Sequence, residues 1–124
     1  LFPYTTLFRS LINNKIELDG IVLADERVLI PLKVTAYWDL KNKKARGEEI
    51  KGDDIKKHKN DAIRLSMLLT DAPMTNVPSR IKDDMKLFID EISDEGGLLR
   101  NLDIAVDNIE SIKNILRKVY GITQ

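Results

Sequence analysis

The chain has 124 residues, of which 43% are hydrophobic and 32% are charged, and its 20 basic residues balance 20 acidic ones. This length is sufficient for one domain with a modest core, and the composition is that of an ordinary globular chain. The absence of cysteine excludes disulfides and thiolate metal sites, and no apolar run approaches the roughly 20 residues of a bilayer-spanning helix, so we expect a cytoplasmic protein with no membrane partner.

Residues 1–10, LFPYTTLFRS, have no basic segment followed by an apolar segment, so they are not a signal peptide. They resemble a translated sequencing-adapter oligonucleotide. We therefore expect residues 1–10 to be an artefact, residues 11–124 to be the genuine domain, and the protein to be truncated on its N-terminal side. The alternative is a native edge strand that includes Phe2, Tyr4 and Leu7.

Residues 15–24, KIELDGIVLA, are the best strand candidate in the chain. Ile16 and Leu18 alternate with acidic residues, and Gly20 indicates a turn between two short strands. A lone hairpin is marginally stable in water, so this segment is expected to need a larger sheet, which also favours a truncated chain.

Four helices are expected to follow the hairpin, because apolar residues recur at helical spacing between segments rich in charge, glycine and proline. Pro31 is expected either to kink the first helix or to start a second one, Asp53 or Asp54 to cap the next, and Gly121 to end the last. Residues 98–106 are expected to form a packed connector. The expected fold class is mainly α, an α+β fragment in which a short N-terminal hairpin precedes helices over about 26–46, 54–71, 79–95 and 107–120.

Each expected helix has an apolar stripe. In the first helix the stripe runs through Val28, Leu29, Leu32, Ala36, Tyr37 and Leu40, with Val34 and Trp38 as a second apolar pair beside it. The stripes of the other three helices are Ile55, Ala62, Leu65 and Leu69; Ile81, Met85, Phe88, Ile89 and Ile92; and Ile109, Ile112, Leu116 and Val119.

Charge is distributed unevenly along the chain. Residues 33–64 include 10 basic and 6 acidic residues, whereas residues 80–110 include 4 basic and 9 acidic residues. The basic half could attract a phosphate-bearing ligand, or the two halves could be solvated faces that attract each other, and composition alone favours the second interpretation.

Two groups of residues could carry chemistry. Lys33 lies on the apolar stripe of the first expected helix, where it is either a lysine whose stem covers apolar surface or a phosphate-binding cation. In the next helix, Asp61 is spaced to pair with Lys57 and Arg64. This set is either a surface ion-pair ladder or a site in which Asp61 orients Lys59 or Arg64 toward a triphosphate. In both groups the residue pattern by itself favours the first alternative.

Other candidates are weaker. His58 lies on the apolar stripe of its helix, where a packed histidine is more common than a ligand or a base, and the chain has no second histidine for a metal site. Glu17 and Asp19 share one face of the expected strand and could hold Mg²⁺, but this spacing is common by chance. The sequence motifs of P-loop, dinucleotide-binding and hydrolase proteins are absent.

The segment LIPLKVTAYWDL at 29–40, followed by DIKKHKNDAIRL at 54–65, resembles the C-terminal half of the AbiEii/AbiGii-type nucleotidyltransferase toxin family. Lys33 matches a lysine that opens a helix in that family, and Lys59, Asp61 and Arg64 stand where its later basic-plus-aspartate motif belongs. The Gly-Ser motif and the paired metal-binding aspartates of that polymerase-β-like fold are absent here. The resemblance therefore implies a C-terminal portion that is inactive alone.

The resemblance implies that the intact protein transfers a nucleotidyl group from an NTP, with Mg²⁺, to an RNA or protein acceptor, and that it has a cognate antitoxin as partner. In the implied site, Lys33 and Lys59 bind the nucleotide, whereas Asp61 and Arg64 are catalytic, and no cofactor is expected for this chain alone. Two other interpretations stay open. One is a non-catalytic helical module that binds a protein or RNA through the basic segment 41–59, and the other is a decayed or mis-assembled reading frame without function.

Overall fold

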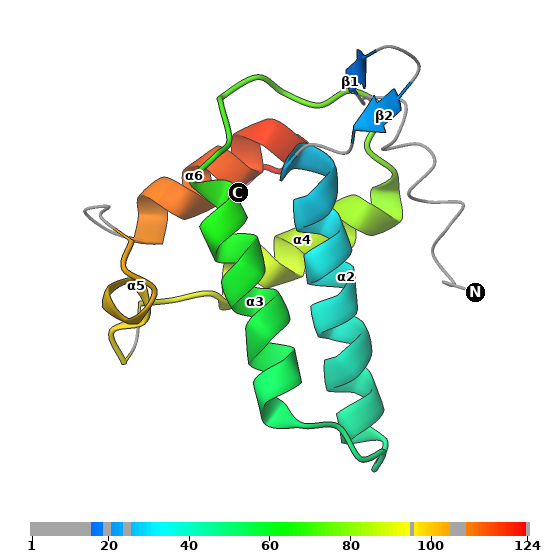
Figure 1. Cartoon of the computed structure of the whole chain (residues 1–124), viewed down its shortest axis with the longest axis vertical. Helices are drawn as coiled ribbons and strands as arrows, with labels where there is room; N and C mark the ends of the chain where they lie inside the picture. The colour runs from blue at the N-terminus through cyan, green and yellow to red at the C-terminus, as the bar shows by residue number, and fades with distance from the viewer. Residues whose placement is uncertain (1–15, 19–20, 24–25, 95, 105–108, 124) are drawn as a thin grey trace.

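The structure is a computed structural model that describes residues 16–18, 21–23, 26–94, 96–104 and 109–123 (Figure 1). In these ranges the chain is mainly helical, as predicted. Its helices are α2 (Glu26–Ala45), α3 (Gly52–Ser66), α4 (Ser79–Glu91), α5 (Leu98–Asn101) and α6 (Ile109–Tyr120). None of the helices in the described ranges is both long enough and apolar enough to cross a membrane.

Two three-residue strands precede the helices. β1 (Ile16–Leu18) and β2 (Ile21–Leu23) pair antiparallel, with Glu17 opposite Val22. The turn expected at Gly20 and both ends of the hairpin predicted over 15–24 lie outside the described residues, and so do residues 1–10. Those interpretations stay predictions.

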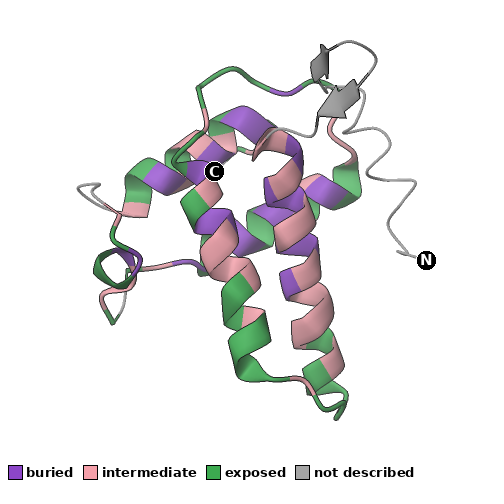
Figure 2. Ribbon diagram, in the orientation of Figure 1, coloured by how far each residue is buried: buried purple, intermediate pink, exposed green. Residues whose placement is uncertain are grey.

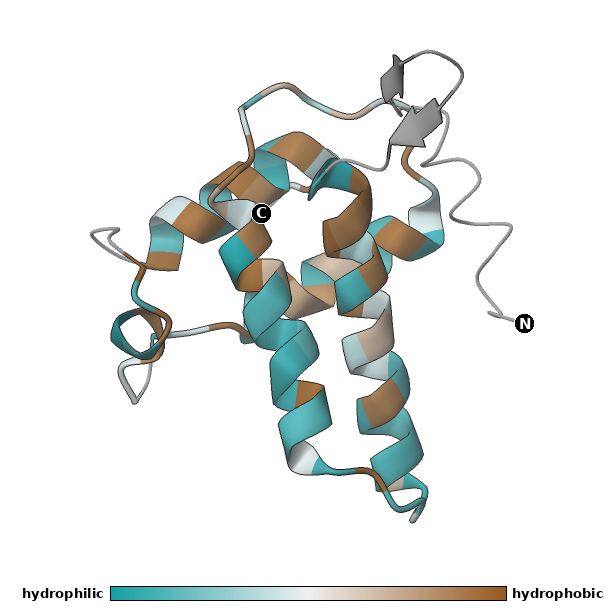
Figure 3. Cartoon of the chain, in the orientation of Figure 1, coloured by the Kyte–Doolittle hydropathy of each residue, from teal (hydrophilic) through white to brown (hydrophobic). Residues whose placement is uncertain are grey.

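The pair formed by α2 and α3 organises the fold. Figure 1 shows the two helices running side by side, with α4 and α6 crossing the half that lies farther from their connecting loop. The half near the loop is largely hydrophilic, whereas the half crossed by α4 and α6 is largely hydrophobic (Figure 3). Burial follows the same division (Figure 2). The core therefore occupies one end of the helix pair, and the other end projects into solvent.

The apolar stripes predicted for the last two long helices are largely confirmed. All five residues of the stripe predicted for this helix are buried, four within α4 and Ile92 just after its end: Ile81, Met85, Phe88, Ile89 and Ile92. In α6 the stripe is buried at Ile112, Leu116 and Val119, and Ile109 packs against it from a partly exposed position. Because full burial of one such side chain contributes about 1.5–3 kcal/mol, these stripes hold α4 and α6 against the helix pair.

The buried face of α2 differs from the predicted stripe. Ile30 and Val34 are fully buried, whereas Leu32, Ala36 and Leu40 are only partly buried. The cause is that α2 packs against both α3 and α4, so its buried face takes residues from two neighbouring stripes. Tyr37 belongs to the predicted stripe and is buried, with 4% of its surface exposed.

Pro31 does not start a new helix, because α2 is continuous from Glu26 to Ala45 with the proline inside it. Proline has no backbone N–H, so Pro31 cannot donate the usual helical hydrogen bond to the carbonyl of Arg27. The hydroxyl of Tyr120, in α6, donates to this carbonyl oxygen at 2.8 Å instead. Tyr120 is fully buried. The last residue of α6 thus supplies the hydrogen bond that the proline removes from α2.

Several helix ends differ from the predicted ones. α3 begins at Gly52, after an N-cap residue, Lys51, that forms no side-chain cap, and Asp53 and Asp54 lie in its first turn. α3 ends at Ser66 rather than near 71. The backbone N–H groups of the next three residues donate to carbonyls three positions earlier, which tightens the end of the helix.

The segment after α4 also differs from the prediction, because part of the expected connector is helical. α4 ends at Glu91, and the chain turns extended at Ile92. The side chain of Asp94 then accepts a hydrogen bond from the backbone N–H of Leu99 at 2.9 Å. This bond satisfies a donor in the first turn of α5, which explains why a short helix forms there.

Tyr120→Phe is expected to lower the free energy of unfolding by about 1–3 kcal/mol, because it removes the buried hydrogen bond to the Arg27 carbonyl. In a Pro31→Ala background, residue 31 regains its N–H and can donate to the same carbonyl, so Tyr120→Phe should then cost less than about 1 kcal/mol. Urea unfolding of the four proteins of this double-mutant cycle measures the difference. Equal losses in the two backgrounds would contradict this account.

Candidate functional site

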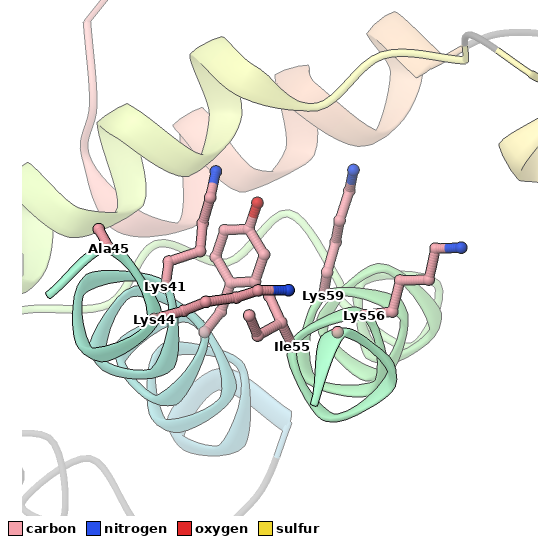
Figure 4. A pocket seen from close by; sticks show the side chains of 8 residues that line it. Lys41, Lys44, Ala45, Ile55, Lys56 and Lys59 are labelled. Atoms are coloured by element: carbon pink, nitrogen blue, oxygen red, sulfur yellow. The ribbon is translucent and has the colours of Figure 1, made fainter. Parts of the chain in front are cut away.

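A pocket lies between the halves of α2 and α3 that are nearer their connecting loop (Figure 4). Its volume is about 490 Å³, which is within the range of small-molecule sites. α2 contributes Tyr37, Lys41, Lys44 and Ala45 to its lining, and α3 contributes Gly52, Ile55, Lys56 and Lys59. We call this pocket the lysine groove.

The four lysines reach the groove because of their spacing. Lys41 and Lys44 are three residues apart on α2, and Lys56 and Lys59 are three residues apart on α3, so each pair lies on one helical face. Figure 4 shows Lys44 extending from α2 toward α3. A Cβ atom placed at Gly52 would lie 3.6 Å from Lys44 Nζ, so this ammonium group stands beside the first turn of α3.

The floor of the lysine groove is apolar. Figure 4 shows the side chain of Ile55 between the two helices. Ala45 and Tyr37 line the α2 side of the groove. Lysine stems add further apolar surface beneath their charged ends. The groove therefore combines an apolar floor with a cationic rim, which suits a ligand that has an apolar part and an anionic part.

One of the four lysines is neutralised by α4. Lys41 Nζ donates to Glu91 Oε1, and the hydroxyl of Tyr37 donates to Glu91 Oε2 at 2.6 Å. The same ammonium group lies 5.2 Å from the ring centroids of both Tyr37 and Trp38. Burial and the hydrogen bond to Glu91 raise the pKa of Tyr37, so this hydroxyl stays protonated and continues to donate.

The carboxyl group of Glu91 stays ionised. Burial by itself would raise the pKa of Glu91, but the hydrogen bonds from Lys41 and Tyr37 outweigh burial and lower it. The hydrogen bond to Glu91 in turn raises the pKa of Lys41. The charges of Lys41 and Glu91 therefore cancel locally.

The other three lysines keep their positive charge available. Within the part of the chain that the structure describes, Lys44, Lys56 and Lys59 form no salt bridge. Lys44 also stands beside the start of α3, where the helix dipole is positive and no side chain caps the backbone. Asp53 and Asp54 in the first turn offset part of this charge. An anion in the groove would meet at least three attractive groups.

Lys33 and Asp61 form an ion pair between α2 and α3. Lys33 Nζ lies 3.2 Å from Asp61 Oδ2, and the two side chains are 33% and 25% exposed. The structure therefore brings together two of the predicted site residues. A partly exposed pair of this kind contributes only about 0–1 kcal/mol, so it adds little stability to the packing of α2 against α3.

The other predicted site residues lie elsewhere. Consecutive helical residues are about 100° apart, so Lys59 and Asp61 point to nearly opposite sides of α3. Asp61 pairs with Lys33 and does not form an ion pair with Lys57, Lys59 or Arg64, and Arg64 is exposed. Lys59 lines the lysine groove. The expected arrangement, in which Asp61 orients Lys59 or Arg64, is not the one that forms.

His58 lies beside the Lys33–Asp61 pair. Its Nδ1 atom is buried and has no hydrogen-bond partner. Burial lowers the pKa of His58, and the nearby charge of Lys33 lowers it further. The lowered pKa favours the neutral imidazole. A packed histidine was expected to have both ring nitrogens hydrogen-bonded, and Nδ1 has no such partner among the described residues.

A magnesium site does not fit the described residues. No group of three or more His, Cys, Asp or Glu side chains that could hold a metal ion occurs among them. Asp19, one of the two carboxylates considered for Mg²⁺, lies outside the described residues. We therefore assign no step to a metal ion here.

Sequence reasoning missed Lys41, Lys44 and Lys56 as individual site residues. The signal that could have found them is the repeated three-residue spacing of lysines on two adjacent helices. One interpretation did assign binding to the basic segment 41–59, which includes Lys41, Lys44 and Lys56. It did not indicate which of its side chains share a pocket.

Comparison with known proteins adds no relative. No family model matches the chain, and neither a search of curated proteins nor a search of solved structures finds a significant match. The assignment of function therefore depends on the geometry described above and on the resemblance in residues 29–65.

We expect the protein to become less stable as the pH falls below about 6.5, the ordinary pKa of histidine. The pKa of His58 is lowered in the folded protein, so in the range between its folded and unfolded values the unfolded chain binds more protons, and stability is lost on acidification. Urea unfolding between pH 7.5 and 5 measures this loss. Subtracting the same curve for His58→Gln removes the contribution of other groups, and identical pH dependence in both proteins would refute the assignment to His58.

Proposed function

We propose that this chain is the nucleotide-binding part of a toxin-type nucleotidyltransferase-like protein and that the lysine groove binds an NTP. The observation that carries the proposal is that Lys44, Lys56 and Lys59, which form no salt bridge with described residues, all line one groove that has an apolar floor. An NTP has the matching two parts, a flat base and a polyphosphate of high negative charge. Lysine is a common phosphate ligand in proteins, as a point charge that several oxygens can share.

The resemblance to nucleotidyltransferase toxins supports this proposal at one position in particular. Lys59 belongs to the matching motif and also lines the lysine groove. The proposal gives Lys33 a different role from the one that the resemblance implies. Because Lys33 is paired with Asp61, it acts as a positioning residue that sets the orientation of α2 against α3.

Nucleotidyl transfer itself is not assigned to the described residues, because they include no carboxylate cluster for Mg²⁺. The RNA or protein acceptor and the antitoxin partner stay part of the proposal through the resemblance alone. What the groove contributes is binding and orientation of the phosphates.

Isothermal titration calorimetry of the chain with each of the four NTPs tests the proposal. Lys44→Ala and Lys59→Ala should each weaken binding about tenfold, because a hydrogen bond to a charged group contributes about 1.5–3 kcal/mol before losses to solvent screening. Lys57→Ala is the matched control, since Lys57 is exposed on the same helix and does not line the groove. It removes the same charge and should change the dissociation constant less than twofold.

Two outcomes would count against the proposal. If Lys57→Ala weakens NTP binding as much as Lys59→Ala does, net charge rather than the groove is responsible. If Lys33→Ala weakens binding as much as Lys59→Ala without changing stability, Lys33 contacts the triphosphate directly, and its assignment as a positioning residue is wrong.

A further inference from the structure

The ion pair between Lys41 and Glu91 joins the wall of the lysine groove to a helix outside it. Lys41 lines the groove, whereas Glu91 belongs to α4 and is not one of the lining residues. Figure 4 shows Lys41 extending toward α4, where its ammonium group meets Glu91. Within the described ranges, this is the one salt bridge that includes a groove lysine.

The pair between Lys41 and Glu91 can be exchanged for another contact. The two side chains are 39% and 33% exposed. Ion pairs with this exposure contribute little free energy, because water and salt screen them. The ammonium group of a lysine also stands on a flexible four-carbon stem, so it can turn toward another anion in the groove that Lys41 already lines.

Glu91 does not lose all its partners when Lys41 leaves. The hydroxyl of Tyr37 donates to the second carboxylate oxygen at 2.6 Å, and burial raises the pKa of Tyr37, so this hydroxyl stays protonated. The carboxylate therefore keeps one hydrogen bond from the protein while water replaces the other. The contact with Tyr37 holds Glu91 at the groove whether or not Lys41 is paired with it.

We infer that Glu91 is an internal competitor of the ligand, because it holds Lys41 in the free protein and an NTP must take this lysine from it. The inference rests on the proposed function, since it concerns the regulation of the same groove. An NTP carries several negative charges and Glu91 carries one, so the phosphates attract Lys41 more strongly. The charge of Lys59 also helps to lower the pKa of Glu91, so Glu91 offsets part of the field of a second groove lysine.

Isothermal titration calorimetry with inorganic triphosphate and with the four NTPs tests the inference. Glu91→Gln removes the negative charge and keeps an oxygen that can accept from Tyr37, so it should tighten binding about three- to tenfold. Asp90→Asn is the matched control, because Asp90 is the exposed neighbour of Glu91 in α4 and does not line the groove. It should change the dissociation constants less than twofold. A purely structural role of Glu91 predicts weaker binding after Glu91→Gln, so the sign of the effect is informative.

The wild-type protein provides a second measurement that does not depend on the folding of a variant. In the free protein, the hydrogen bonds from Lys41 and Tyr37 outweigh burial and lower the pKa of Glu91. A saturating triphosphate that takes Lys41 removes one of these hydrogen bonds and adds negative charge nearby. NMR titration of the Glu91 carboxyl group should therefore show a pKa that rises on binding, and an unchanged pKa overturns the inference.

The possible results separate this inference from the proposed function. NTP binding that depends on Lys44 and Lys59 but is equally tight after Glu91→Gln overturns the inference and leaves the proposed function intact. Equal tightening by Glu91→Gln and Asp90→Asn also overturns the inference, because net charge then accounts for the effect. Triphosphate binding that tightens only with Glu91→Gln, without any NTP binding, supports the inference for an inorganic anion and overturns the assignment of NTP.

Discussion

The hydrogen bond from the Tyr37 hydroxyl to Glu91 is the interaction on which the arrangement of the helices and the groove depends. Tyr37 is buried, and its ring meets that of Phe88 edge to face with centroids 5.6 Å apart, so α2 and α4 are joined by packing as well as by a polar contact. A buried hydroxyl needs such a partner, because leaving it without a hydrogen bond would cost the free energy of removing it from water. The same carboxylate accepts from Lys41. One acidic residue thus fixes two residues of the groove wall.

The same contact shows where the basic and acidic halves of the chain meet. Glu91 belongs to the acidic half and Lys41 to the basic half, so the two halves do attract each other where they meet. Among the described residues, Glu91 forms a salt bridge with only one of the four groove lysines, Lys41, although the charge of Lys59 also helps to lower the pKa of Glu91. Lys44, Lys56 and Lys59 form no salt bridge within the described ranges, since no acidic residue of α4 comes within 4 Å of them. The structure thus shows the two halves in contact at this pair, and the attraction of a phosphate-bearing ligand by the basic half stays a prediction.

The Lys33–Asp61 pair shows how a predicted contact can form without the predicted role. Both residues were identified as site candidates, and they do meet between α2 and α3. Asp61 points away from Lys59 whether or not it contacts Lys33, because residues two positions apart in a helix point to nearly opposite sides. His58, which is partly exposed but has a buried Nδ1 atom, lies beside the same pair. One side of α3 thus faces an ion pair and a packed histidine, and the other side faces the lysine groove.

The sequence by itself determined where most helices lie and which residues of α4 and α6 are buried. Each of these helices has one apolar face, marked by the spacing of Met85 and Phe88 or of Ile112 and Leu116, and that face is the one that is buried. It did not determine the buried face of α2, where Ile30 and Val34 are covered, because that helix has two neighbours and two apolar stripes. Nor did it determine that Lys41 and Lys44 line one groove with Lys56 and Lys59. Spacing along one helix says nothing about how that helix is rotated against the next, and only tertiary packing sets this rotation.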